Sequence, residues 1–100
     1  MALRVLWTDR AKGHLRDILD FIALDNPDAA RALARKVLGS VRRLAEFPRA
    51  GRRLPELADA PFRERVVPPC RAIYQVRGND LIILVVIRTE RRWVPLLLDH

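Results

Sequence analysis

Residues 81–88 have the sequence LIILVVIR, and the seven apolar residues 81–87 form the longest unbroken hydrophobic run in the chain. A run of this length that follows the turn Gly78-Asn79-Asp80 predicts a buried strand. A membrane-spanning helix would need about 20 such residues. We therefore expect residues 81–88 to form a strand inside a sheet, with helices covering one of its faces.

Shorter strands are predicted on the N-terminal side of this run. Residues 3–7 form a short apolar stretch, and residues 62–67 and 71–76 alternate between polar and apolar side chains on either side of Pro68-Pro69. Along an alternating strand, Arg71 shares a face with Ile73, whereas Tyr74 points to the opposite face. We expect Tyr74 to lie in the core beneath the helices, in preference to stacking on a nucleobase.

Two amphipathic helices are predicted between the first strand and the others. Apolar residues recur at helical spacing over residues 9–24, after the N-cap candidate Thr8, and over residues 27–47, after the N-cap candidate Asn26. Residues 48–61 are expected to form an irregular basic loop. The predicted fold is α+β, a helical hairpin packed on one face of a small antiparallel-rich sheet, in the order β-α-α-β-β-β.

Size and composition indicate one globular domain, residues 1–100, whose tail at 93–100 could be a loose end, a short helix or a strand. The single cysteine excludes an internal disulfide, and neither a metal nor a cofactor is expected. The N-terminus lacks the features of a signal peptide, so a cytoplasmic location is expected.

Charge gives the first functional indication. Nineteen Lys and Arg residues against twelve Asp and Glu give a net charge of +7, and all but two of the basic residues are arginine. The guanidinium suits phosphates and carboxylates, which indicates an acidic partner, either nucleic acid or an acidic protein segment. A genome rich in GC would produce the same preference for arginine over lysine.

Several motifs occur in the order typical of one family. Residues 44–53 (LAEFPRAGRR), the pair Arg63-Glu64, residues 69–76 (PCRAIYQV) and residues 82–93 (IILVVIRTERRW) resemble the patterns that close the helical hairpin and build the strands of ParE/RelE toxins of type II toxin–antitoxin systems. Residues 11–30 resemble the first half of the same family. Cys70 stands where the family often has tyrosine, and Arg88 stands where it often has histidine.

This resemblance implies two alternative activities. RelE-like members are ribosome-dependent mRNA endonucleases, whereas ParE-like members poison DNA gyrase and have no hydrolytic activity attributed to them. Members of both branches are held inactive by an antitoxin whose C-terminal segment wraps the toxin. We expect that segment to be acidic and to bury apolar surface around the helical hairpin or at a strand edge. Homodimerisation of the free toxin would agree with such a patch.

The residues offer little for acid–base catalysis. RNA cleavage needs a base, an acid and cations, yet the only histidines are His14, expected on a solvated helix face, and the C-terminal His100. Glu64 and Glu90 are as well explained as ion-pair partners of neighbouring arginines. Both lysines fall in the predicted helices. If the chain is a ribonuclease, the candidate catalytic residues are Arg65, Arg71 and Arg88.

A binding surface is the preferred interpretation of the arginines, which we expect to line the helix-free face of the sheet and the preceding loop. The alternative is a solvated polar sheet face. Trp93 could be an aromatic anchor of that surface or could cover the edge of the core. The candidate target-binding residues are Arg49, Arg52, Arg53, Arg63, Arg65, Arg71, Arg88, Arg91, Arg92 and Trp93.

From the sequence we therefore expect a ParE-like toxin that inhibits DNA gyrase by binding and not as an enzyme. The alternative is a RelE-like mRNA endonuclease, and an inactive toxin kept as an antitoxin partner remains a third interpretation. An RNA-binding sheet is disfavoured because only Tyr74 places an aromatic ring within the later strands.

Overall fold

The computed structural model describes residues 2–93, so residues 94–100 of the predicted tail, with His100, lie outside the described residues. Strand β5 (Asp80–Arg88) lies inside a five-stranded sheet of order β1-β5-β4-β3-β2. It pairs in parallel with β1 (Arg4–Trp7) and antiparallel with β4 (Cys70–Arg77). The interior position explains why its sequence is apolar almost without interruption.

The sheet continues beyond β4 through β3 (Arg63–Val67) and a short β2 (Arg52–Arg53), both antiparallel to their neighbours. Strand β2 and a 3₁₀ turn, η1 (Pro55–Leu57), fall in the segment that was expected to be irregular. The α+β prediction and its element order are otherwise confirmed.

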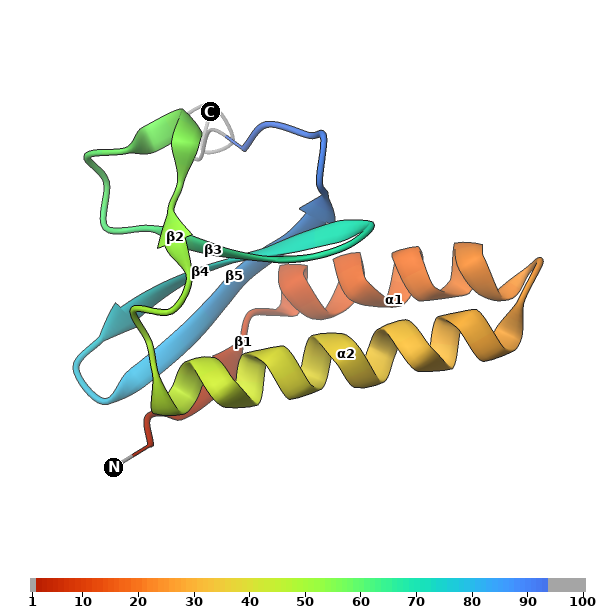
Figure 1. Ribbon diagram of the computed structural model, residues 1–100, viewed down its shortest axis with the longest axis horizontal. Coiled ribbons are helices and arrows are strands. Elements are labelled where there is room, and N and C mark those ends of the chain that lie inside the picture. The colour runs from red at the N-terminus through yellow and green to blue at the C-terminus, as the bar shows by residue number, and fades with distance from the viewer. Residues whose placement is uncertain (1, 94–100) are drawn as a thin grey trace.

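The helices α1 (Asp9–Ala23) and α2 (Pro27–Glu46) run side by side along one face of the sheet (Figure 1). Their N-caps are those predicted: Thr8 Oγ1 accepts from the amide of Ala11 at 3.0 Å, and Asn26 Oδ1 accepts from the amide of Ala29 at 3.0 Å. Each cap satisfies one of the backbone amides that a helix start leaves unpaired. Neither helix is long and apolar enough to cross a membrane within residues 2–93.

The main core lies between the helices and the sheet. Leu44 of α2 and Ile83 of β5 are fully buried there, with Tyr74 of β4. The Tyr74 hydroxyl donates to the carbonyl of Pro48 at 2.6 Å and accepts from the amide of Gly51 at 3.1 Å. The prediction that Tyr74 is a core residue is confirmed, and its hydroxyl fastens the segment that follows α2.

A second, smaller core covers part of the opposite face of the sheet. Ile73 of β4 and Val85 of β5 pack there against Leu54 and Trp93, all of them buried. The rings of Phe62 and Trp93 meet edge to face, with centroids 5.2 Å apart and an interplanar angle of 79°. The face without helices is therefore not the open polar surface that the sequence suggested, because residues 54–62 and 93 cover part of it.

Candidate functional site

The strand arginines do not share one face of the sheet. Arg63 pairs with Tyr74 and Arg65 with Ala72, whereas Arg88 pairs with Cys70. Directly paired residues project from the same face, and Tyr74, Ala72 and Cys70 belong to the core beneath the helices. Arg63, Arg65 and Arg88 thus leave the sheet on the helix side. The expectation that they line the helix-free face is wrong.

Arg71 projects from the face without helices, and there it is buried. Its guanidinium Nη1 donates to Glu64 at 2.7 Å and to Glu56 at 3.1 Å, and its Nη2 donates to Glu56 and to the backbone carbonyl of Arg91. The exposed fractions of the Arg71, Glu56 and Glu64 side chains are 5%, 8% and 0%. Glu64 also accepts from the exposed Arg52. Glu64 is thus an ion-pair partner, one of the two interpretations offered by the sequence.

The electrostatics of this network follow from its geometry. The Arg71 guanidinium lowers the pKa of Glu56 from 4.5 to about 2 against the opposing effect of burial. Hydrogen bonds to Glu56 raise the pKa of Arg71. Both groups are therefore charged at neutral pH. Because the guanidinium of Arg71 is buried and ion-paired with Glu56 and Glu64, it is not available to bind a target.

The network also anchors the segment that follows β5. Besides the bond from Arg71 to the carbonyl of Arg91, the backbone amide of Trp93 donates to Glu56 Oε2 at 2.9 Å. Two carboxylates and one guanidinium that are distant in sequence thus hold residues 91–93 against the sheet. Trp93 is buried in the second core, the position that the sequence gave as an alternative to an exposed anchor.

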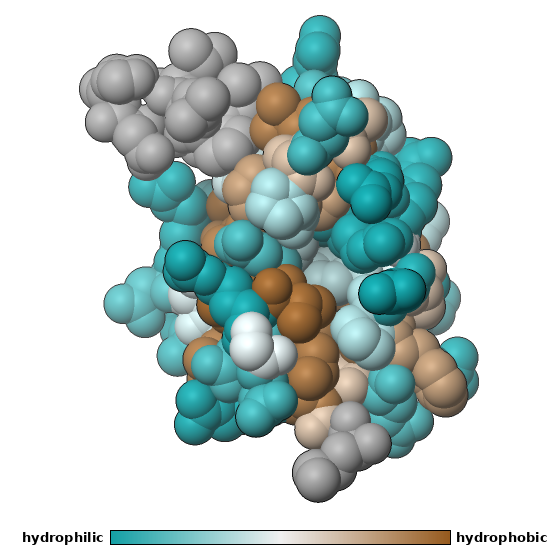
Figure 2. All heavy atoms as spheres, turned by 90° about the vertical axis from the view of Figure 1, so that its left-hand side faces the viewer, coloured by the Kyte–Doolittle hydropathy of each residue, from teal (hydrophilic) through white to brown (hydrophobic). Residues whose placement is uncertain are grey.

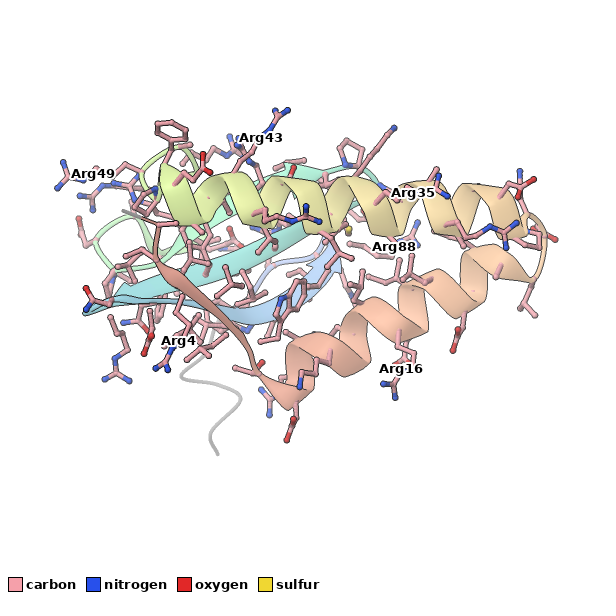
Figure 3. All side chains as sticks on the ribbon, turned by 90° about the horizontal axis from the view of Figure 1, so that it is seen from below. Arg4, Arg16, Arg35, Arg43, Arg49 and Arg88 are labelled. Atoms are coloured by element: carbon pink, nitrogen blue, oxygen red, sulfur yellow. The ribbon has the colours of Figure 1, made fainter. Side chains whose placement is uncertain are left out.

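The remaining candidate arginines have varied environments. Arg63 Nη1 donates to the carbonyl of Gly51 at 2.9 Å, and the exposed Arg88 pairs with Glu90 at 3.1 Å. Arg49 is exposed and points away from the body of the protein (Figure 3). The arginines labelled in Figure 3 extend from β1, from both helices, from the loop after α2 and from β5. Positive charge therefore surrounds the molecule and is not confined to one sheet face.

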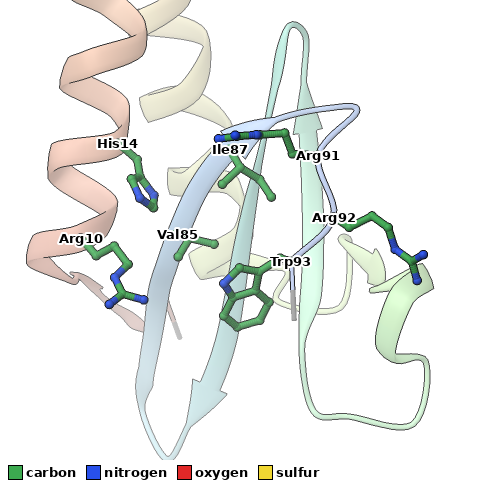
Figure 4. A pocket seen from close by; sticks show the side chains of 7 residues that line it. All are labelled: Arg10, His14, Val85, Ile87, Arg91, Arg92 and Trp93. Atoms are coloured by element: carbon green, nitrogen blue, oxygen red, sulfur yellow. The ribbon is translucent and has the colours of Figure 1, made fainter. Parts of the chain in front are cut away.

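One pocket combines several positive groups with apolar walls. It has a volume of about 470 Å³ and lies between the first turns of α1, the end of β5 and residues 91–93 (Figure 4). Its lining residues are Arg10, His14, Val85, Ile87, Arg91, Arg92 and Trp93. The pocket brings the predicted target-binding residues Arg91, Arg92 and Trp93 next to Arg10 and His14 of α1. The sequence gave no indication that these two segments would meet.

His14 lies differently from the solvated surface histidine that was expected. It is half-buried, and its Nδ1 accepts from the backbone amide of Val86 in β5 at 3.4 Å. Burial and the charges of Arg10 and Arg91 lower its pKa, against the opposing effect of Asp17. A neutral imidazole at pH 7 follows, in a locally positive environment. The four-residue spacing of Arg10 and His14 already indicated one helix face, although not what that face meets.

Apolar surface is exposed elsewhere on the helical hairpin. A groove of about 410 Å³ is lined by apolar side chains of β1 and both helices, with Lys12, Arg16 and Asp20 at its borders. Its apolar members are Trp7, Leu15, Leu19 and Leu38. Phe21 and Leu24, near the turn between the helices, are 68% and 82% exposed. On the side viewed in Figure 2, hydrophobic side chains also surface in patches framed by hydrophilic ones.

Within residues 2–93, no group of three His, Cys, Asp or Glu side chains could hold a metal ion. The three arginines proposed for ribonuclease chemistry do not converge either, because Arg65 and Arg88 leave one face of the sheet and Arg71 the other. These three arginines therefore do not form a single cationic site.

Comparisons with known proteins place the chain in a family. Residues 5–93 match the family model described as ParE toxin of the type II toxin–antitoxin system parDE. The chain is 37% identical over 89 residues to Toxin RelE2 of Caulobacter vibrioides, which covers 89% of this chain and 97% of that protein.

Solved structures show the same fold. The chromosomal ParDE toxin–antitoxin system of Pseudomonas aeruginosa matches with a TM-score of 0.72 and 25% identity, covering 89% of this chain and 98% of the other. The RelBE2 toxin–antitoxin complex of Mycobacterium tuberculosis matches with a TM-score of 0.60 and 20% identity, covering 88% and 99%. The chain therefore belongs to the ParE/RelE superfamily and is the toxin component of a type II toxin–antitoxin system.

Proposed function

We propose that this toxin acts in the cytoplasm by binding DNA gyrase, without catalysis of its own, and that a cognate antitoxin neutralises it. The observation that carries the proposal is the environment of Arg71. Arg71, one of the three arginines proposed for ribonuclease chemistry, is buried between Glu56 and Glu64, away from the face that carries Arg65 and Arg88. A guanidinium held in this way cannot stabilise a phosphorane.

The match to the ParE family model over residues 5–93 supports the same branch. The relative named RelE2 keeps the ribosome-dependent mRNA endonuclease as the second candidate. Of the groups that the sequence offered for proton transfer within the described residues, Glu64 is ion-paired with Arg71, which leaves His14 and Glu90. His14 lies in the pocket beside α1, and Glu90 forms an exposed ion pair with Arg88. Both therefore lie near Arg88, and among residues 2–93 neither forms a hydrogen bond or an ion pair with Arg65 or Arg71.

The surface available to a target is narrower than the sequence suggested. Of the candidates, Arg49, Arg53, Arg91 and Arg92 have exposed side chains and no carboxylate partner among residues 2–93. We assign target contact to these four. For the antitoxin, the apolar groove of Trp7, Leu15, Leu19 and Leu38 provides hydrophobic surface that a partner segment would bury.

The test is a DNA supercoiling assay with purified gyrase, titrated with this protein in the presence and absence of its antitoxin. We expect loss of supercoiling or accumulation of cleaved DNA, reversed by the antitoxin. Arg91→Gln with Arg92→Gln should weaken the inhibition, whereas Arg42→Gln on the outer surface of α2 should not. Unchanged gyrase activity over a wide excess of toxin would exclude the proposal for that gyrase. Cleavage of mRNA on translating ribosomes would then be measured.

A further inference from the structure

We propose that the pocket between α1 and residues 91–93 binds a carboxylate side chain that the antitoxin inserts into it. The inference rests on the proposed function, because it concerns how the toxin is neutralised. The guanidinium groups of Arg10 and Arg91 lie at one opening of about 470 Å³, whereas the side chain of Arg92, which also borders the pocket, extends away from it (Figure 4). None of these three side chains has a carboxylate partner among the residues that the structure describes.

A second observation inside the pocket points to a missing acceptor. Trp93 is only 7% exposed, yet its indole Nε1 has no hydrogen-bond partner within residues 2–93. Figure 4 shows the nitrogen edge of the ring turned toward β5 and the side of the pocket that carries Arg10. A buried donor without an acceptor is costly, so an incoming oxygen would be stabilised there.

The walls favour a protein carboxylate over a nucleic-acid phosphate. Val85, Ile87 and the Trp93 ring give the pocket apolar walls beside its cationic groups. A Glu or Asp side chain carries a single charge on an apolar stem and can sit in a segment that is otherwise hydrophobic. A nucleic-acid backbone carries a charge at every unit and would place charged and sugar groups against these apolar walls.

The pocket is prepared in advance by the buried ion network. Arg71 holds the carbonyl of Arg91 and Glu56 holds the amide of Trp93, so both residues are fixed opposite Arg10 and His14 before any partner arrives. A partner therefore does not bear the cost of ordering this segment. Its carboxylate would also cover Arg91, one of the arginines assigned to target contact. Occupation of the pocket thus explains neutralisation as direct competition with the target.

The first experiment uses the two tryptophans as internal probe and control. The ¹⁵N-labelled full-length protein is titrated with the peptides acetyl-Ala-Glu-Ala-amide and acetyl-Ala-Gln-Ala-amide, and separately with a short DNA duplex. We expect the Glu peptide to shift the indole signal of Trp93 but not that of Trp7. The Gln peptide should shift neither. Equal shifts with both peptides, no shift with either, or a Trp93 response to DNA at lower concentration than to the Glu peptide would overturn the proposal.

The second experiment measures antitoxin affinity. Arg10→Gln should weaken binding of the antitoxin roughly tenfold, as expected when one hydrogen bond to a charged group is lost. The control Arg42→Gln should change it less than about twofold. Because Arg10 is not among the target-contact residues, the Arg10→Gln toxin should still inhibit gyrase. Equal affinities of the two variants for the antitoxin would refute the pocket assignment. A wild-type toxin without effect on gyrase would refute gyrase as the target, and the peptide titration would then decide whether the pocket binds a carboxylate.

Discussion

Arg71→Met is the substitution with the largest expected effect on stability among the candidate site residues. Methionine keeps much of the volume of the side chain but removes the guanidinium that lies between Glu56 and Glu64. The Glu64 side chain is fully buried and would keep only the exposed Arg52 as a partner, while Glu56 would keep only the amide of Trp93. The two carboxylates would then carry charge in a poorly solvated site.

The size of the effect follows from the cost of an uncompensated buried charge. Removing one member of a buried ion pair costs about 3–5 kcal/mol, most of it from the partner left behind. A domain of this length has a total stability of about 5–15 kcal/mol, so the loss would be a substantial part of it. At roughly 4–8 °C per kcal/mol, the melting temperature should fall by more than about 12 °C.

The assays are thermal and urea-induced unfolding followed by circular dichroism, with two comparison variants. Arg88→Met breaks only the exposed pair with Glu90 and should leave the midpoint almost unchanged. Arg71→Met combined with Glu56→Gln and Glu64→Gln removes all three charges and should recover much of the stability. A stable Arg71→Met protein, or a triple variant as unstable as the single one, would show that unpaired buried carboxylates are not the cause.

Three further outcomes follow from the structure. Gly51→Ala should destabilise the fold by about 1–3 kcal/mol in the same unfolding assay, because a Cβ there would meet the Tyr74 hydroxyl and lie 2.6 Å from the carbonyl of Glu64. The double variant Gly51→Ala with Tyr74→Phe should recover part of this loss, and no recovery would contradict the explanation. Glu56 has a folded-state pKa of about 2 against an ordinary value of 4.5, so the ionised carboxylate contributes up to about 3 kcal/mol to the free energy of unfolding above pH 4.5. This contribution is lost as the pH falls toward 2. The difference in stability between wild type and Glu56→Gln should therefore close over that range, and a constant difference would argue against it. Leu44→Ala in the main core should cost about 2–5 kcal/mol, whereas Leu24→Ala, at a side chain that is 82% exposed, should change the free energy of unfolding little.

Local features of the fold could be predicted from the sequence because they depend on neighbours along the chain. The caps at Thr8 and Asn26 need only a side-chain oxygen next to a helical pattern, and both are present in the structure. Alternation along β4 correctly separated Arg71 from Tyr74, since successive strand residues point to opposite faces. The apolar run at 81–87 likewise indicated a strand inside the sheet.

The absolute orientation of the arginines depended on a register that the sequence did not reveal. The pairing of β3 with β4 is set by the short turn at Pro68-Pro69, and it places Arg63 opposite Tyr74. That register puts Arg63 and Arg65 on the helix side. A shift of one residue would have moved both to the other face, and the alternating pattern would have looked the same.

The composition and order of motifs thus determined the fold class and the family, because both depend on local periodicity and on residues next to one another in the chain. Only the tertiary structure decided what each charge is used for. Arg71 is neutralised by Glu56, fifteen residues away in sequence, and His14 meets the amide of Val86, seventy-two residues away. Burial of such distant groups and pairing between them arise only when the helices pack on the sheet. These interactions decide whether an arginine stabilises the fold or remains available to bind a partner.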